Sequence, residues 1–255
     1  MDKPATERPN DLVTVAALAV LAYFVSDLLH EGLGHGVTAW LSGAHRLTLS
    51  TVALQSDIAS RWISANGTLV NLAAAAVLWF ILRKRYAPAL TYFLVMTLAA
   101  NLFTGTGYFF FSGVTNFGDW AEVIRGLQPH WIWQAGLIVL GVVSYYASML
   151  LVARELRRFK SPLRSLCWTP YFTEAALSAV AGLFNPAGLF YVVASALPST
   201  LGANAGLLSL PFMMRGWKPA ADPLPIPRSR VSIALGVIAA LVFIVILGRG
   251  ITFTH

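Results

Sequence analysis

Residues 12–41 read LVTVAALAVLAYFVSDLLHEGLGHGVTAWL, an apolar run long enough to cross a membrane as a helix. This run contains two histidines and a glutamate, His30, Glu31 and His35. Ionisable side chains are costly in a bilayer, and those that occur there usually mark a functional site. Imidazoles are common zinc ligands, and a nearby carboxylate can activate a metal-bound water. The stretch therefore predicts a hydrolytic metal site within a membrane helix, with a structural polar cluster as the alternative.

The composition of the whole chain is that of a membrane protein. Of its 255 residues 57% are hydrophobic and 11% are charged, whereas soluble domains carry about 25% charged residues. The net charge of +7 does not indicate nucleic-acid binding, because the basic residues form short clusters beside apolar runs. The single Cys167 excludes an intrachain disulfide and a cysteine-based zinc site.

Hydropathy predicts an all-α polytopic membrane protein with about six to seven transmembrane helices. The expected spans are residues 12–41, 62–82, 88–111, 131–152, one from about 171 that is interrupted at Asn185-Pro186, a short segment 201–214, and 231–247. We expect residues 1–130 to form the core that carries the metal site. Residues 131–255 then add further helices to the same membrane domain.

The basic residues orient these spans. With the amino terminus in the cytoplasm, most Lys and Arg residues lie on the cytoplasmic side, as the positive-inside rule requires. The exceptions are Arg46, Arg61, Arg125 and Arg249. This orientation places the motif His30-Glu31-Gly32-Leu33-Gly34-His35 in the outer half of the first span. We therefore expect the site to face the external side, which is periplasmic or luminal.

Polar residues of other spans are expected at the same membrane depth as the motif. They are Asn66 and Asn71 in the second span, Asn101 and Thr104 in the third, and Asp119 just beyond it. Each has an ordinary alternative, since Asn and Thr often bond between helices and a loop Asp is often only solvated. Asp27, one helical turn before Glu31, is a candidate hydrogen-bond partner for a ligand imidazole.

The motif and the following Ala39-Trp40-Leu41-Ser42-Gly43 resemble the opening of the site-2 protease family of intramembrane zinc metallopeptidases. In that family a His-Glu-x-x-His helix precedes a Gly-Pro-x-x-Asn element and an Asp beside a Gly. Here Gly67-Thr68-Leu69-Val70-Asn71 stands in place of the second element, with Thr in place of Pro. Gly118-Asp119 stands in place of the third, in reversed order. The resemblance covers roughly residues 12–125.

The resemblance implies that His30, His35 and Asp119 hold Zn²⁺, with Glu31 as general base and Asn71 orienting the substrate or stabilising the oxyanion. Asn66, Asn101, Thr104 and Asp27 are weaker candidates for supporting the ligands or contacting substrate. The implied protein is a membrane-embedded zinc metallopeptidase that cleaves a membrane protein or peptide near the outer face. Two alternatives remain: a membrane zinc hydrolase acting on a lipid amide or another non-peptide bond, and a non-catalytic metal-binding protein.

The spacing of the histidines departs from the family, because they are five residues apart instead of four. On an ideal α-helix this separates them by about 140°, so both bind one ion only if the helix widens. Gly32 and Gly34 favour such a π-bulge. The dipeptidyl peptidase III type of zinc peptidase is similar in using His-Glu-x-x-Gly-His. Alternatively, Glu31 pairs with His35 on an unbroken helix, as in a carboxylate-bridged iron site.

Residues 45–54, His-Arg-Leu-Thr-Leu-Ser-Thr-Val-Ala-Leu, contain β-branched residues in partial alternation. This pattern predicts a small external strand or hairpin, with a simple loop over the site as the alternative. An edge strand beside a peptidase site can hold an extended substrate through backbone hydrogen bonds.

Overall fold

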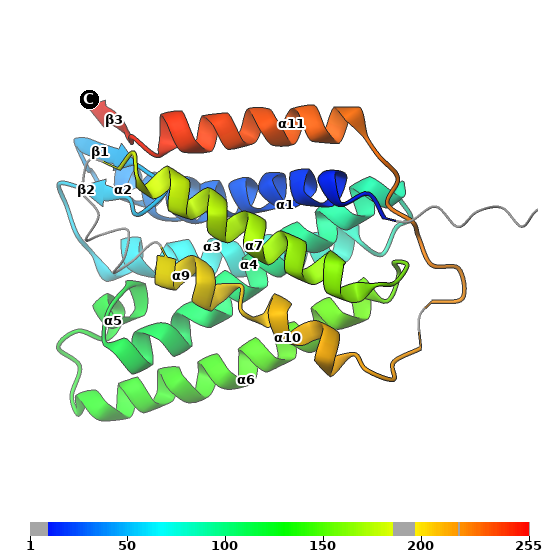
Figure 1. Cartoon of the computed structure of the whole chain (residues 1–255). Coiled ribbons are helices and arrows are strands. Elements are labelled where there is room, and N and C mark those ends of the chain that lie inside the picture. The colour runs from blue at the N-terminus through cyan, green and yellow to red at the C-terminus, as the bar shows by residue number, and fades with distance from the viewer. Residues whose placement is uncertain (1–9, 186–196, 219, 255) are drawn as a thin grey trace, which may run out of the picture.

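The computed structural model describes residues 10–185, 197–218 and 220–254. Long helices run side by side along the molecule, and a small sheet lies at one end (Figure 1). In chain order the elements are α1 (Leu12–Asp27), η1 (Leu28–Gly36), α2 (Val37–Leu41), β1 (Arg46–Leu49), β2 (Gln55–Ser56), α3 (Arg61–Ile81), α4 (Pro88–Thr115), α5 (Asp119–Ile124), α6 (His130–Leu156), α7 (Leu163–Gly182), α9 (Leu197–Ala203), α10 (Gly206–Met213), α11 (Arg230–Leu241), η3 (Val242–Leu247) and β3 (Ile251–Thr254).

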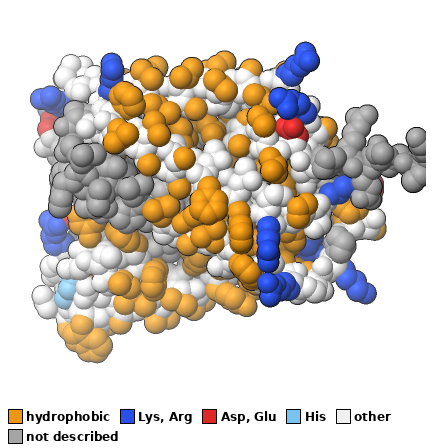
Figure 2. Space-filling model, viewed as in Figure 1, with side chains coloured by type: hydrophobic (Ala, Val, Ile, Leu, Met, Phe, Trp, Pro, Cys, Tyr) orange, Lys and Arg blue, Asp and Glu red, His pale blue; other side chains and the backbone are white. Residues whose placement is uncertain are grey.

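Five helical segments are long and apolar enough to cross a membrane. They are Leu12–Leu41, Arg61–Ile81, Pro88–Thr115, His130–Leu156 and Arg230–Leu247, and each coincides with an expected span to within a few residues. Figure 2 shows hydrophobic side chains spread along the face of the molecule that is turned to the viewer, with Lys and Arg side chains mainly toward its two ends. The arrangement is consistent with an all-α membrane protein.

The two remaining expected spans differ from the structure. Helix α7 begins at Leu163, earlier than expected, because Pro162 precedes it and the polar residues of its first turns do not interrupt the helix. It ends at Gly182, before the interruption expected at Asn185-Pro186, and Pro186 lies outside the described residues. The segment 201–214 is not one helix, since α9 ends at Ala203 and α10 begins at Gly206. Hydropathy indicates which segments are apolar enough to enter a membrane, but it does not show whether such a segment forms one continuous helix.

Local sequence signals set where the main helices begin. Asp11 caps α1, because its carboxylate accepts a hydrogen bond from the Thr14 backbone N–H at 2.8 Å. Ser60 caps α3 in the same way through the Ile63 N–H. Pro88 lies in the first turn of α4, where its missing N–H costs no helical hydrogen bond.

Helix α4 is the central element of the bundle, and its neighbours come from both halves of the chain. Its fully buried Tyr92 donates a hydrogen bond to the Leu166 carbonyl of α7 at 2.7 Å. Helix α6 approaches α4 so closely that a Cβ on Gly141 would lie 2.4 Å from the Phe110 backbone nitrogen. The main hydrophobic core therefore combines residues of α1, α3 and α4 with residues of α6, α7 and α10.

The sheet has three antiparallel strands in the order β2-β1-β3. Leu47 of β1 lies opposite Ser56 on one side and Phe253 on the other. The pairing of β1 with β2 confirms the expected hairpin. Strand β3 was not expected, although the alternating Ile-Thr-Phe-Thr after Gly250, whose φ is +79°, is a strand signal.

The topology is tested by cysteine labelling at two exposed loop positions. With the amino terminus in the cytoplasm, Gln128 lies between α5 and α6 on the external side, and Ser161 follows α6 on the cytoplasmic side. An impermeant thiol reagent on intact cells should label Gln128→Cys and not Ser161→Cys, while permeabilised cells should label both. The native Cys167 is buried and should react little. The reverse pattern would place the motif on the cytoplasmic side.

Candidate metal centre

The helix widens at the His-Glu motif. Residues Leu28–Gly36 form the π-helix η1, which confirms the widening expected between His30 and His35. The two imidazoles face each other, with their Nε2 atoms 3.1 Å apart and their rings perpendicular. The alternative pairing of Glu31 with His35 assumed an unbroken α-helix, which is absent here. Glu31 nevertheless forms, with His30 and His35, a group whose ligand atoms lie within 4.8 Å of one another, so its role as a ligand stays open.

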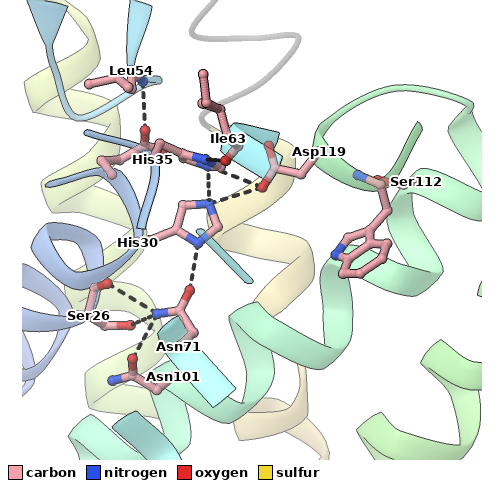
Figure 3. A network of polar contacts seen from close by, with 11 residues as sticks. Ser26, His30, His35, Leu54, Ile63, Asn71, Asn101, Ser112 and Asp119 are labelled. Atoms are coloured by element: carbon pink, nitrogen blue, oxygen red, sulfur yellow. Dashed lines mark hydrogen bonds and ion pairs between the residues drawn. The ribbon is translucent and has the colours of Figure 1, made fainter. Parts of the chain in front are cut away.

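Asp119 completes a cluster with the two imidazoles (Figure 3). Its Oδ2 atom lies 3.2 Å from Nε2 of His30 and 3.3 Å from Nε2 of His35. Asp119 is the first residue of α5, and the turn before it contains Asn116 and Gly118, whose φ values are +52° and +85°. This reversal after α4 directs the carboxylate back toward η1.

Hydrogen bonds at the opposite ring nitrogens fix the orientation of both imidazoles. His35 Nδ1 lies 2.6 Å from the Ile63 carbonyl oxygen, and His30 Nδ1 lies 2.6 Å from Oδ1 of Asn71. Carbonyl oxygens only accept hydrogen bonds, so each Nδ1 carries the proton. In the neutral rings each Nε2 therefore has a free lone pair, the state that binds a metal.

The orientation of the Asn71 amide follows from a relay of hydrogen bonds. Its Nδ2 donates to Oδ1 of Asn101 at 2.7 Å and lies 3.3 Å from the Ser26 carbonyl oxygen. Asn101 in turn donates to the Thr97 carbonyl oxygen at 2.8 Å. Because Asn71 is fully buried and its donors are engaged, it positions His30. The expected contact of Asn71 with the substrate or the oxyanion stays a prediction.

The three facing atoms match the donor set of a metal ion. Three such atoms repel one another unless a cation, or a proton on an imidazole nitrogen, lies between them. Oδ2 of Asp119 is buried and accepts no hydrogen bond of normal geometry within the described residues. The spacings of 3.1, 3.2 and 3.3 Å are close to the edge of roughly 3.3 Å that a tetrahedral zinc site with N and O ligands has.

The charge state of Asp119 fits the same interpretation. Burial by itself raises the pKa of this carboxyl group, but the imidazoles of His35 and His30, in their protonated form, lower it, so that the pKa lies below its ordinary value. Asp119 is therefore ionised at neutral pH and supplies an anionic oxygen to the cluster.

Glu31 lies next to the cluster of the two imidazoles and Asp119. One oxygen of its carboxylate lies within 4.8 Å of a ring nitrogen of each histidine. Its Oε2 accepts a hydrogen bond from the Leu54 backbone N–H at 2.6 Å, which holds the side chain against the loop between β1 and β2. This position is suited to proton transfer at a metal held by the other three residues.

Two glycines allow η1 and α3 to come together at the site. A Cβ on Gly34 would lie 2.5 Å from the Cα of Gly67. A Cβ on Gly67 would lie 2.4 Å from Nε2 of His35 and 2.8 Å from Cε1 of His30. Any larger residue at Gly67 would occupy the space of the imidazoles. Gly32, by contrast, has no atom within 4 Å of its Cβ position.

The weaker candidates lie around the centre in different roles. Asn66 donates to Thr38 Oγ1 at 2.9 Å and so joins α3 to α2, and Asn101 reaches the site only through Asn71. Asp27 bonds to neither imidazole, because Ile63 and Asn71 take that role. Instead, Asp27 and Thr104 line a cavity beside His30.

Sequence reasoning missed Tyr108, whose ring stacks on His30 with centroids 5.0 Å apart. A signal was present, since Asn101, Thr104 and Tyr108 share one face of a helix at spacings of three and four residues. The Ile63 contact uses a backbone carbonyl and leaves no signal in the sequence.

No protein-family model matches the chain, and no curated protein or solved structure was found to be similar to it. The interpretation of the site therefore rests on its own geometry.

Gly32 and Gly34 form a matched pair for testing the helix contact. Substitution by Ala favours a regular helix by about 1 kcal/mol at either position, but only at Gly34 does the new Cβ meet another helix. We expect Gly34→Ala to lower bound metal strongly and Gly32→Ala to retain it, as measured by elemental analysis of purified, monodisperse protein. Equal metal content in the two variants would contradict the role of the close contact.

A second pair of variants tests the role of Asn71. Asn71→Leu removes the acceptor for His30 Nδ1 and should weaken metal binding by about 10- to 100-fold, as measured by competition with a chelator. Asn66→Leu, on the same helix but bonded to Thr38, should leave the metal affinity almost unchanged. A similar loss in both variants would mean that α3 itself had shifted.

Proposed function

We propose that this protein is a membrane-embedded metallohydrolase that binds Zn²⁺ through His30, His35 and Asp119 and hydrolyses a peptide bond. One observation carries the proposal: three buried lone-pair atoms point at one another beside the carboxylate of Glu31. They lie at one end of a helical segment that is apolar enough to cross a membrane.

The donor set favours zinc. Two imidazole nitrogens and one carboxylate oxygen are typical of catalytic zinc sites, which keep a further position open for water or substrate. When bound, such an ion acidifies water and polarises the carbonyl group to be cleaved.

The side chains around the centre have separate roles in the proposed reaction. Glu31 receives the proton of the attacking water and passes it to the leaving amine. The Leu54 N–H fixes one oxygen of Glu31 and leaves the other for this transfer. Asn71 and the Ile63 carbonyl keep both imidazoles in the tautomer that binds metal.

The sheet beside the site favours a peptide substrate. Strand β2 begins at Gln55, immediately after Leu54, and within the described residues it pairs with β1 on one side only. Its other edge offers backbone groups to an extended chain. A peptide added there would run past the residue that contacts Glu31.

One observation favours the second candidate, hydrolysis of a lipid amide. An apolar cavity of about 480 Å³ lies between α4, α6 and α9. Tyr108 forms part of its wall and stacks on His30. An acyl chain in this cavity would reach close to the metal ligands.

Four variants separate binding from catalysis. His30→Ala, His35→Ala and Asp119→Ala should each lower zinc content, whereas Glu31→Gln should keep zinc and lower peptide hydrolysis by about 10²- to 10⁴-fold. Metal analysis and turnover of a peptide library in detergent or nanodiscs provide the two measurements.

Turnover of lipid amides instead of peptides would favour the second candidate. Full activity of Glu31→Gln would remove Glu31 as the base, and zinc binding without any turnover would indicate a non-catalytic metal protein.

A further inference from the structure

A small polar cavity lies beside the metal centre. Its volume is about 40 Å³, and it is lined by residues of α1 and η1, α4, the loop between β1 and β2, and the α9 region. Its lining includes Asp27, Glu31, Thr51, Tyr108 and Asn204. A water molecule needs roughly 10–15 Å³ of such space, so the cavity accepts one small polar group or a few waters.

Two buried side chains of this lining have polar atoms without partners. Asn204 is 1% exposed, and neither Oδ1 nor Nδ2 has a hydrogen-bond partner among the described residues. Thr51 is 9% exposed, and its hydroxyl likewise has none within that part of the chain. Buried polar groups in folded proteins are nearly always hydrogen-bonded. Unpartnered atoms around a cavity therefore point to a ligand that completes them.

The chemistry of the lining selects the ligand. Two carboxyl groups, those of Asp27 and Glu31, line the cavity. No Lys or Arg is part of the lining. Carboxylate, amide and hydroxyl oxygens accept hydrogen bonds, and a primary ammonium offers three donors and the complementary charge.

We propose that this cavity binds the free amino group of a peptide substrate, so that the metal centre cleaves beside an amino-terminal residue. This inference rests on the proposed function and narrows its substrate class. Asp27, Thr51 and Asn204 are the binding residues, and the shared lining by His30 and Glu31 places the amino group next to the bond that is cleaved.

The first test measures binding without turnover. Metal-loaded protein in phosphatidylcholine nanodiscs is titrated calorimetrically with leucine hydroxamate and with N-acetyl-leucine hydroxamate, which differ in the free amine. The wild type should prefer the free amine by roughly tenfold or more, because a charge-assisted hydrogen bond is lost on acetylation. Asp27→Asn should abolish this preference. Asp222→Asn, an exposed carboxyl in the linker before α11, should retain it.

The outcomes separate this inference from the proposed function. Equal affinity for the two hydroxamates, or binding of neither, overturns the amino-group pocket whether or not peptides are cleaved. A preference for the free amine without peptide turnover keeps the pocket and overturns the hydrolase. Loss of the preference when phosphatidylethanolamine is added to the nanodiscs assigns the cavity to a lipid amine instead. If the protein binds a second metal ion and Asp27→Asn removes that ion, the cavity is a metal site and the proposal is also overturned.

A second variant distinguishes binding from structural support. Asn204→Leu removes an amide that is buried without partners, so it should raise the melting temperature while lowering the preference for the free amine. Asn66→Leu removes a partnered amide and should not raise the melting temperature. A lower melting temperature for Asn204→Leu, with the preference intact, would show that Asn204 supports the fold and does not bind the ligand.

Discussion

The structure around His30, Glu31 and His35 is organised by one electrostatic constraint, the convergence of two imidazole nitrogens and one carboxylate oxygen on a single point. Two imidazole nitrogens and one carboxylate oxygen approach within 3.1–3.3 Å in a buried environment. Such an arrangement is unfavourable unless a metal cation or an imidazole proton balances it. The wide helix η1, the contact of Gly34 with Gly67 and the left-handed turn before α5 are each needed to produce it. These features lie in three separate elements, which the central helix α4 helps to hold together.

Much of this architecture could be predicted from the sequence, because its signals are local or periodic. Long apolar runs indicated the five spans, and the five-residue histidine spacing required the widening that η1 shows. The Gly118-Asp119 pair indicated a candidate third ligand, although only the folded chain could place it beside the histidines. The break between α9 and α10 and the pairing of β3 with β1 depend on tertiary contacts that hydropathy does not register.

The role of Asn71 shows why residue type and depth do not suffice to assign a function. Asn71 and Asn204 are both asparagines, and both are almost completely buried beside the same centre. Every polar atom of Asn71 has a partner, so this side chain supports what surrounds it. Neither polar atom of Asn204 has a partner in the described structure, so this side chain still has bonding capacity to offer. The difference lies in hydrogen-bond saturation, which only the assembled structure reveals.

The wide turn of η1 also affects how such proteins can be recognised. A search pattern written for two histidines four residues apart assumes regular helical geometry, and it passes over a chain in which a wider helix brings two histidines five residues apart face to face. Here the wider helix extends over the nine residues of η1, and α2 continues as an ordinary helix after it. The spatial arrangement of the three donor atoms is therefore a more durable signature of this kind of centre than the letters that encode it. A geometric query built on that triangle would tolerate insertions that a linear motif cannot.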